Sequence, residues 1–302
     1  MAQLIKLYDY ISRYETNMYQ YSSQYIRLKL ENWKKIKHRW EQGELHPNEE
    51  EGESLYEREA RDKMWLRFFR KEKVEYDVGT PEEPWTPATM MELKQYFLDG
   101  ILPFQVKWAS TTIQKKSFIE KTIYKDQMLK ILLQRLPDTF LVMYYPVVEI
   151  KSVPVEAEIL IIGPHEVEII SVMEVPDVTM IHPSSESSWQ VEKMGEHAKV
   201  FSPMHGLKRT ETFVRSVLHT YTLDFSFHKV VLAPSHTFDG AKPPFLTSYI
   251  DSTNFSEWLD KKRKLNAPLK HKQLKVANLL MRHTKTIAFK RPEWETDETS
   301  EK

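Results

Sequence analysis

The chain has 302 residues, of which 41% are apolar and 28% charged, and its 43 basic side chains balance its 43 acidic ones. A net charge of zero points to no partner, so attraction to nucleic acid or membrane must come from a local patch. The chain has no cysteine, which excludes disulfides, thiolate metal sites and cysteine nucleophiles. No stretch approaches the roughly eighteen apolar residues of a transmembrane helix, and the charged first residues do not resemble a signal peptide. We therefore expect a cytoplasmic protein without a membrane span.

Residues 1–110 predict an all-helical N-terminal region that is rich in aromatic side chains. Apolar residues at spacings of three and four predict an amphipathic helix over 23–42. Further helices are expected over 54–73 and 88–98, separated by proline-containing loops. We interpret the aromatic stripes as packing between helices. The alternative is that this region docks a protein partner.

From residue 111 onward the pattern changes to that of an α/β domain. We expect a helix over 115–137 that stops at a Leu-Pro pair, then three short apolar strands and a helix over 203–221. Two further strands and a last helix follow, which predicts a mixed sheet flanked by helices over 111–262. Residues 263–292 form a basic helical segment in this interpretation. The acidic tail, 293–302, is expected to be disordered.

The stretch VEAEILIIGPHEVEIISVMEV reads as two apolar strands joined by the turn GPHE. Antiparallel pairing through this turn sets Glu158 opposite Ser171, and the same register sets Glu156 opposite Met173. Because side chains alternate along a strand, all four point to one face of the hairpin. The sequence therefore predicts a cluster of two carboxylates, a hydroxyl and a thioether.

The spacing of these residues resembles that of the PD-(D/E)xK nucleases, and more narrowly the bacterial nuclease-related domain known as NERD. Those proteins have an acid on a helix that ends in Leu-Pro, an acid on a later strand, and an acid-x-lysine on the strand after that. Here Asp126 lies ten residues before a Leu-Pro pair, and Glu158 takes the place of the strand acid. Ser171 follows thirteen residues later, where the second acid belongs, and Met173 stands in place of the lysine.

The later motifs of that domain are altered as well. Trp189 and the sequence Ser-Pro-Met-His-Gly, which ends at Gly206, stand where the family has a tryptophan and Asn-Pro-x-x-Gln. The resemblance covers about residues 115–260. It implies a restriction-endonuclease-like mixed sheet flanked by helices.

In such nucleases the two acids bind Mg²⁺, and the lysine orients or activates the attacking water. The resemblance thus assigns Asp126 and Glu158 to the metal. Ser171 and Met173 offer Mg²⁺ a neutral hydroxyl and a soft thioether, both poor ligands for it. We therefore expect a catalytically degenerate copy that needs no cofactor and is not an enzyme.

Two alternatives stay open for the carboxylates. Asp126, Glu156 and Glu158 form a migrated metal site in an active Mg²⁺-dependent nuclease, with a basic group lent by His205 or Lys208. Otherwise the two glutamates are ordinary polar residues near a sheet edge.

Residues 261–291 carry eleven Lys and Arg and no acidic residue. Interspersed apolar residues predict a basic amphipathic helix in the middle of this segment. Such stripes bind phosphate backbones without reading sequence, whereas the alternatives are a solvated helix face or an anionic membrane surface. The residues expected to bind DNA or RNA are Lys261, Lys262, Arg263, Lys264, Lys270, Lys272, Lys275 and Arg282.

The eleven histidines form no pair with the spacing of known metal-ligand motifs. His182 and His236 lie near prolines, and we interpret both as surface residues in loops. No nucleotide-binding loop or serine-nucleophile motif occurs.

Overall fold

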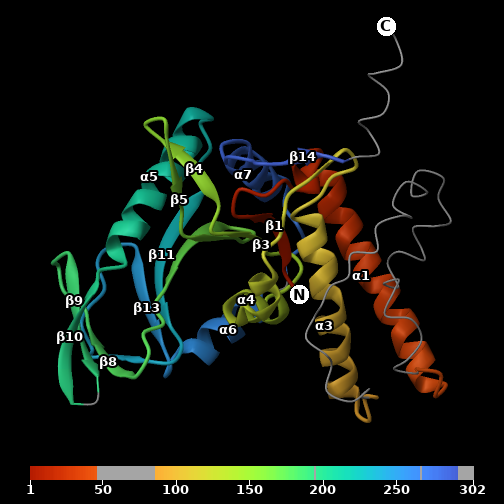
Figure 1. Cartoon of the computed structure of the whole chain (residues 1–302), viewed down its shortest axis with the longest axis horizontal. Coiled ribbons are helices and arrows are strands. Elements are labelled where there is room, and N and C mark those ends of the chain that lie inside the picture. Colours follow the sequence, from red (N-terminus) through yellow and green to blue (C-terminus); the bar gives the residue numbers. More distant parts are fainter. Residues whose placement is uncertain (46–85, 194, 266, 292–302) are drawn as a thin grey trace, which may run out of the picture.

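A six-stranded mixed sheet forms the centre of the computed structural model, which describes residues 1–45, 86–193, 195–265 and 267–291 (Figure 1). The strand order is β1-β3-β6-β7-β11-β13. Its strands are β1 (Gln3–Leu7), β3 (Leu141–Tyr144), β6 (Ile159–Ile162), β7 (Glu166–Val172), β11 (Ser226–Ala233) and β13 (Thr247–Asp251). The prediction of a mixed α/β sheet is confirmed.

The central strands follow one another in the predicted order. Helix α4 (Gln127–Arg135) leads into β3, β6 and β7, which form an antiparallel meander. Helix α5 (Met204–Thr220) then leads into β11, which runs parallel to β7. Ile162 pairs with Val167, so the predicted register of the hairpin is confirmed.

A second sheet, with strand order β10-β9-β8-β12, lies at one end of the molecule (Figure 1). Its strands are β8 (Val178–His182), β9 (Ser188–Lys193), β10 (Glu196–Phe201) and β12 (Thr237–Phe238). Trp189 of β9 is fully buried, and its ring contacts Tyr249 of β13 with centroids 5.6 Å apart. Burial of a large aromatic side chain stabilises strongly, so Trp189 fixes the small sheet against the large one.

The described residues of the N-terminal region, 1–45 and 86–110, are mainly helical, as predicted, except at the start of the chain. Helices α1 (Met18–Glu41) and α3 (Met90–Trp108) lie side by side (Figure 1), and Trp33 packs against Phe97 with ring centroids 5.3 Å apart. This contact confirms packing between the helices for Trp33 and Phe97. The prediction of an all-helical region is wrong for β1, however, which pairs parallel to β3 and is buried throughout. A segment of five residues, QLIKL, is too short for its periodicity to distinguish strand from helix.

Two helix limits differ from prediction. The expected helix over 115–137 consists of β2 (Lys115–Lys116), the short 3-10 helix η3 (Lys121–Lys125) and α4. Asp126 therefore caps α4 instead of lying inside a long helix, and its side chain accepts from the Leu129 N–H at 2.9 Å. Asp at this position satisfies an otherwise unbonded amide of the first turn. Helix α3, in contrast, runs ten residues past the expected end at 98.

Smaller elements complete the described part of the chain. They are the 3-10 helix η1 (Arg13–Glu15), a hairpin of β4 (Val147–Ile150) and β5 (Val153–Glu156), helices α6 (Phe255–Arg263) and α7 (His271–Arg282), and β14 (Phe289–Lys290). No helix among the described residues has the length and apolar content to cross a bilayer. The helix expected over 54–73 and the tail 293–302 lie outside the described residues. The domain limits stay predictions.

Candidate functional site

Glu158, one residue before β6, lies against the first turn of α5. Its backbone N–H donates to Thr210 Oγ1 of α5 at 2.9 Å, and its carboxylate accepts a hydrogen bond from Ser171. A Cβ atom on Gly206 would come within 1.8 Å of Glu158 Oε1. The hairpin thus brings Glu158 and Ser171 together as predicted, and the absence of a side chain at position 206 makes room for the carboxylate.

The environment of Glu158 raises the pKa of its carboxyl group toward neutral pH. Burial raises its pKa to about 7, against the opposing effects of the Ser171 hydrogen bond and the Arg209 charge, while Glu156 adds to the increase. The Arg209 guanidinium also donates to the Glu156 backbone carbonyl, with Nη2 at 3.1 Å from the oxygen. A carboxyl group with a pKa near 7 can both accept and donate a proton under physiological conditions.

Asp126 has both of its carboxylate oxygens engaged by the protein. Oδ1 accepts from the Leu129 N–H, and Oδ2 accepts from the Tyr144 hydroxyl at 2.7 Å. Burial raises the pKa of Tyr145, and the charges of Glu158 and Asp126 raise it further. Tyr145 therefore lies close enough to both Asp126 and Glu158 for their charges to raise its pKa.

Glu156 and Met173 do not face each other as predicted. Glu156 ends β5 and pairs with Val147 of β4, and the next residue, Ala157, extends this pairing by donating its N–H to the carbonyl of Pro146 at 2.9 Å. Met173 is 7% exposed and continues the β7–β11 ladder. The predicted cluster of four side chains is thus reduced to Glu158 and Ser171, with Glu156 close enough to raise the Glu158 pKa.

This set of donors fits Mg²⁺ poorly. Asp126 is committed to capping α4, Ser171 is neutral, and Glu158 is not held in its charged form at neutral pH. Mg²⁺ prefers anionic, hard oxygen ligands in near-ideal octahedral geometry. In the described part of the chain, the group whose donor atoms lie close enough to hold a metal is elsewhere. It consists of His182, Glu192 and His197 of the small sheet, whose donor atoms lie within 4.8 Å of one another.

The basic residues of α6 are engaged within the protein. Lys261 pairs with Glu257 at 2.8 Å, and Arg263 pairs with Asp260 at 3.1 Å. The side chain of Lys262 is 11% exposed and pairs with Glu168 of β7, which leaves it no access to a phosphate backbone. Lys264 is exposed just after the helix.

Helix α7 presents its cations differently. Its buried side includes Leu274, Val276, Ala277 and Leu280, which confirms the predicted amphipathic helix. Lys272, Lys275 and Arg282 are exposed on the opposite side, and none of them forms an ion pair with any residue that the structure describes. Lys270, at the start of α7, contacts His165 instead. Exposed cations of this kind are the groups that bind the phosphates of nucleic acids.

Several residues near Glu158 escaped prediction. His205 and Lys208 were the expected basic neighbours, but Arg209 is the cation whose charge acts on Glu158. Helical spacing would have found it, because positions three and four residues after Gly206 lie on the same face of α5.

The prediction that His236 lies on the surface is wrong. His236 is 5% exposed, and its Nδ1 lies 2.9 Å from the carbonyl of Val178.

A stretch of 113 residues of the chain is 37% identical to a Geobacillus stearothermophilus protein named RNA 2',3'-cyclic phosphodiesterase. The stretch covers 35% of this chain and 36% of that protein, so the chain spans about a third of the length of the curated relative it matches. No family model matches the chain. No solved structure matches it either.

Proposed function

We propose that the protein binds RNA through the outer face of α7, on a nuclease-like α/β domain that does not cleave the bound strand. The observation that carries the proposal is a set of three exposed cations on one side of α7 that form no ion pair within the described part of the chain: Lys272, Lys275 and Arg282. Arg and Lys that neutralise phosphates release counterions, which supplies most of the affinity in sequence-independent binding.

The order of elements supports a PD-(D/E)xK-like scaffold. Helix α4, the meander β3-β6-β7, helix α5 and the parallel strand β11 follow one another as the resemblance to the nuclease-related domain implies. The name of the Geobacillus relative supports RNA as the nucleic acid, for the third of its length that is matched.

Three features of the carboxylate centre support the loss of metal-dependent cleavage. Ser171 donates to Glu158 where a second metal carboxylate belongs, and Met173 is buried where the lysine belongs. Burial also raises the pKa of Glu158 to about 7, which weakens it as an anionic ligand. Without a second carboxylate, too little negative charge faces a divalent ion to hold it for in-line attack on a phosphodiester.

Electrophoretic mobility of a labelled single-stranded RNA at low salt tests the binding. We expect a shift with the full chain, and at least a tenfold weaker shift when Lys272, Lys275 and Arg282 are all changed to Ala. A matched variant removes the same charge from three exposed cations that have acidic partners, Lys37, Lys261 and Arg263. It is expected to bind within about twofold of wild type, because exposed pairs project little net field. Equal loss in both variants, or no shift at low salt, contradicts the proposal.

Incubation of the same RNA and of plasmid DNA with Mg²⁺ or Mn²⁺ tests the second half of the proposal. We expect both nucleic acids to stay intact. Cleavage that disappears in Glu158→Ala would show instead an active centre around Asp126, Glu156 and Glu158. A preference for duplex DNA over RNA in the mobility assay would overturn the choice of RNA.

A further inference from the structure

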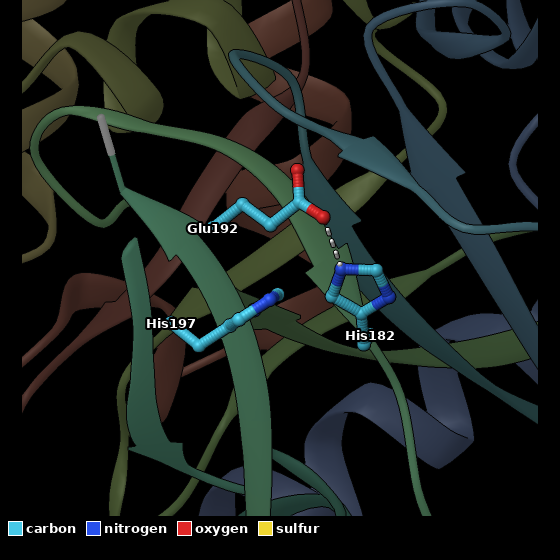
Figure 2. A group of neighbouring side chains, drawn as sticks. All are labelled: His182, Glu192 and His197. Carbon is cyan, nitrogen blue, oxygen red and sulfur yellow. Dashed lines mark hydrogen bonds and ion pairs between the residues drawn. The ribbon is translucent and has the colours of Figure 1, made fainter. Parts of the chain in front are cut away.

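Each strand of the small sheet places a polar side chain on the same exposed side. In the order of the strands these are His197 of β10, Glu192 of β9, His182 of β8, and Asp239 directly after β12. Figure 2 shows the first three converging from the three adjacent strands. The proposed function uses none of these residues.

The backbone of the sheet fixes how these side chains meet. Glu192 pairs directly with His197 across β9 and β10. His182 lies opposite Gln190, one alternation away from Glu192 on the same face. Trp189, on the reverse face, is fully buried, so the strands are anchored from behind.

The donor atoms of these side chains lie near the separations that a metal site requires. His182 Nε2 lies 3.1 Å from Glu192 Oε1, and the three donors of His182, Glu192 and His197 lie within 4.8 Å of one another. Ligand atoms around tetrahedral zinc are separated by about 3.4 Å, given bond lengths of about 2.1 Å. Small side-chain rotations therefore suffice to bring all three donors to one ion.

Asp239 supplies a feature that a chance cluster does not need. Its Oδ2 lies 2.9 Å from His182 Nδ1, and its Oδ1 accepts from the Ala241 N–H at 3.0 Å. A carboxylate on Nδ1 fixes the tautomer that directs Nε2 toward the shared position. Carboxylates in this arrangement recur behind metal-binding histidines, where they orient the ring and raise its basicity.

We propose that His182, Glu192 and His197 bind a zinc-type divalent ion on the exposed side of the small sheet, with Asp239 as the positioning residue for His182. Two imidazoles and one carboxylate are ligands that Zn²⁺ and Co²⁺ accept readily, whereas Mg²⁺ disfavours nitrogen. Three protein ligands leave a fourth position for water or an anion.

Titration of the chelator-treated full chain with Zn²⁺ and with Co²⁺ tests the site without any activity assay. We expect a single equivalent to bind at micromolar concentration or tighter, and Co²⁺ to give the visible absorption of a tetrahedral nitrogen–oxygen site. His197→Ala is expected to weaken binding at least tenfold. His197 is exposed, so this variant keeps the fold, as its thermal unfolding will confirm.

Two further variants separate a built site from general histidine affinity. Asp239→Asn leaves all three ligands in place and is expected to weaken Zn²⁺ binding by about tenfold to a hundredfold. His219→Ala removes an exposed histidine of α5 and is expected to change nothing. Absence of stoichiometric binding, or binding that survives His197→Ala unchanged, would leave the three side chains as a plain surface ion pair with a neighbouring histidine.

Discussion

Two glutamates of the central hairpin, the partly buried Glu158 and the buried Glu168, have different partners. Glu168 of β7 meets Lys262 of α6 at 2.5 Å. Glu158 meets the first turn of α5 and accepts from Ser171. Ser171 and Glu168 lie on opposite faces because they are three residues apart on one strand. Burial raises the pKa of both glutamates, but only the Glu168 carboxylate has a lysine in contact among the residues described.

The two glutamates differ in the cations that lie near them. The resemblance places a lysine at position 173, on the face of Glu158, where this chain has a buried methionine. Lys262 of α6 pairs with Glu168 on the other face, and its Nζ lies 4.6 Å from the centroid of the Trp258 ring. The ion pair with Lys262 therefore stabilises the fold at Glu168. Glu158 has no such lysine among the described residues, and its pKa is raised to about 7.

The largest expected effect is that of Lys262→Met. Removing the lysine leaves Glu168 buried without its partner, and the loss of one member of a buried pair destabilises by about 3 kcal/mol. Urea unfolding at neutral pH measures the change in the free energy of unfolding. Lys261→Ala, next in sequence but exposed, is expected to change it by less than about 0.5 kcal/mol. Similar effects of the two variants would contradict the contrast between the faces.

The pH dependence of stability tests the Glu158 side. Because burial raises its pKa from the ordinary 4.5 to about 7, the folded chain binds this proton more tightly than the unfolded chain does. The associated stability is present below about pH 4.5 and is lost as the pH rises through about 7, with a total of about 1 to 3 kcal/mol. Glu158→Gln is expected to remove this slope and to be more stable than wild type at pH 8. An unchanged slope in the variant would contradict the raised pKa.

Gly206→Ala tests the contact between α5 and Glu158. The new methyl group would meet Glu158 Oε1 at 1.8 Å, so the carboxylate must move, at about 1 to 2 kcal/mol. The same substitution in a Glu158→Ala background is expected to be neutral or stabilising, because Ala is favoured over Gly within a helix by about 1 kcal/mol. A double-mutant cycle of unfolding free energies measures this coupling. Zero coupling would mean that the two residues are not in contact.

The smallest expected effect is that of Ser171→Ala. The hydroxyl stabilises the charged form of Glu158, so its loss is expected to raise the Glu158 pKa further, by an amount equivalent to about 1 kcal/mol. Carboxyl chemical shifts followed by NMR across the titration measure the pKa directly. A decrease in pKa would show that Ser171 does not donate to the carboxylate.

Sequence patterns predicted the parts of the fold that depend on local periodicity and turn geometry. The register that pairs Ile162 with Val167 follows from the turn alone, and α7 follows from apolar spacing. The strand at Gln3–Leu7 did not, because its pairing with β3 joins residues far apart in the chain. Glu156 was misplaced for a related reason: its strand pairs with β4 through a turn at Lys151 and Ser152, and the register of the β6–β7 hairpin does not include that pairing.

In the candidate sites, too, residues that are close in the sequence could be predicted to meet, whereas residues brought together by long-range pairing could not. Glu158 and Ser171 share one hairpin, so spacing could bring them together. His182, Glu192 and His197 come from three strands and Asp239 follows a fourth, so the spacing of histidines along the chain does not predict that these side chains meet. Lys262 appeared in sequence as one more cation of a basic run, and only the position of α6 reveals its partner Glu168.

The most direct test of the central claim is the salt dependence of RNA affinity for wild type and for the chain with Lys272, Lys275 and Arg282 changed to Ala. Fluorescence anisotropy of a labelled single-stranded RNA, recorded over a series of KCl concentrations, gives the slope of log K against log salt. If these three side chains contact phosphates, the slope is expected to fall in magnitude by about 2 in the variant, at about 0.7 per contact. Identical slopes for the two proteins would contradict RNA binding by α7.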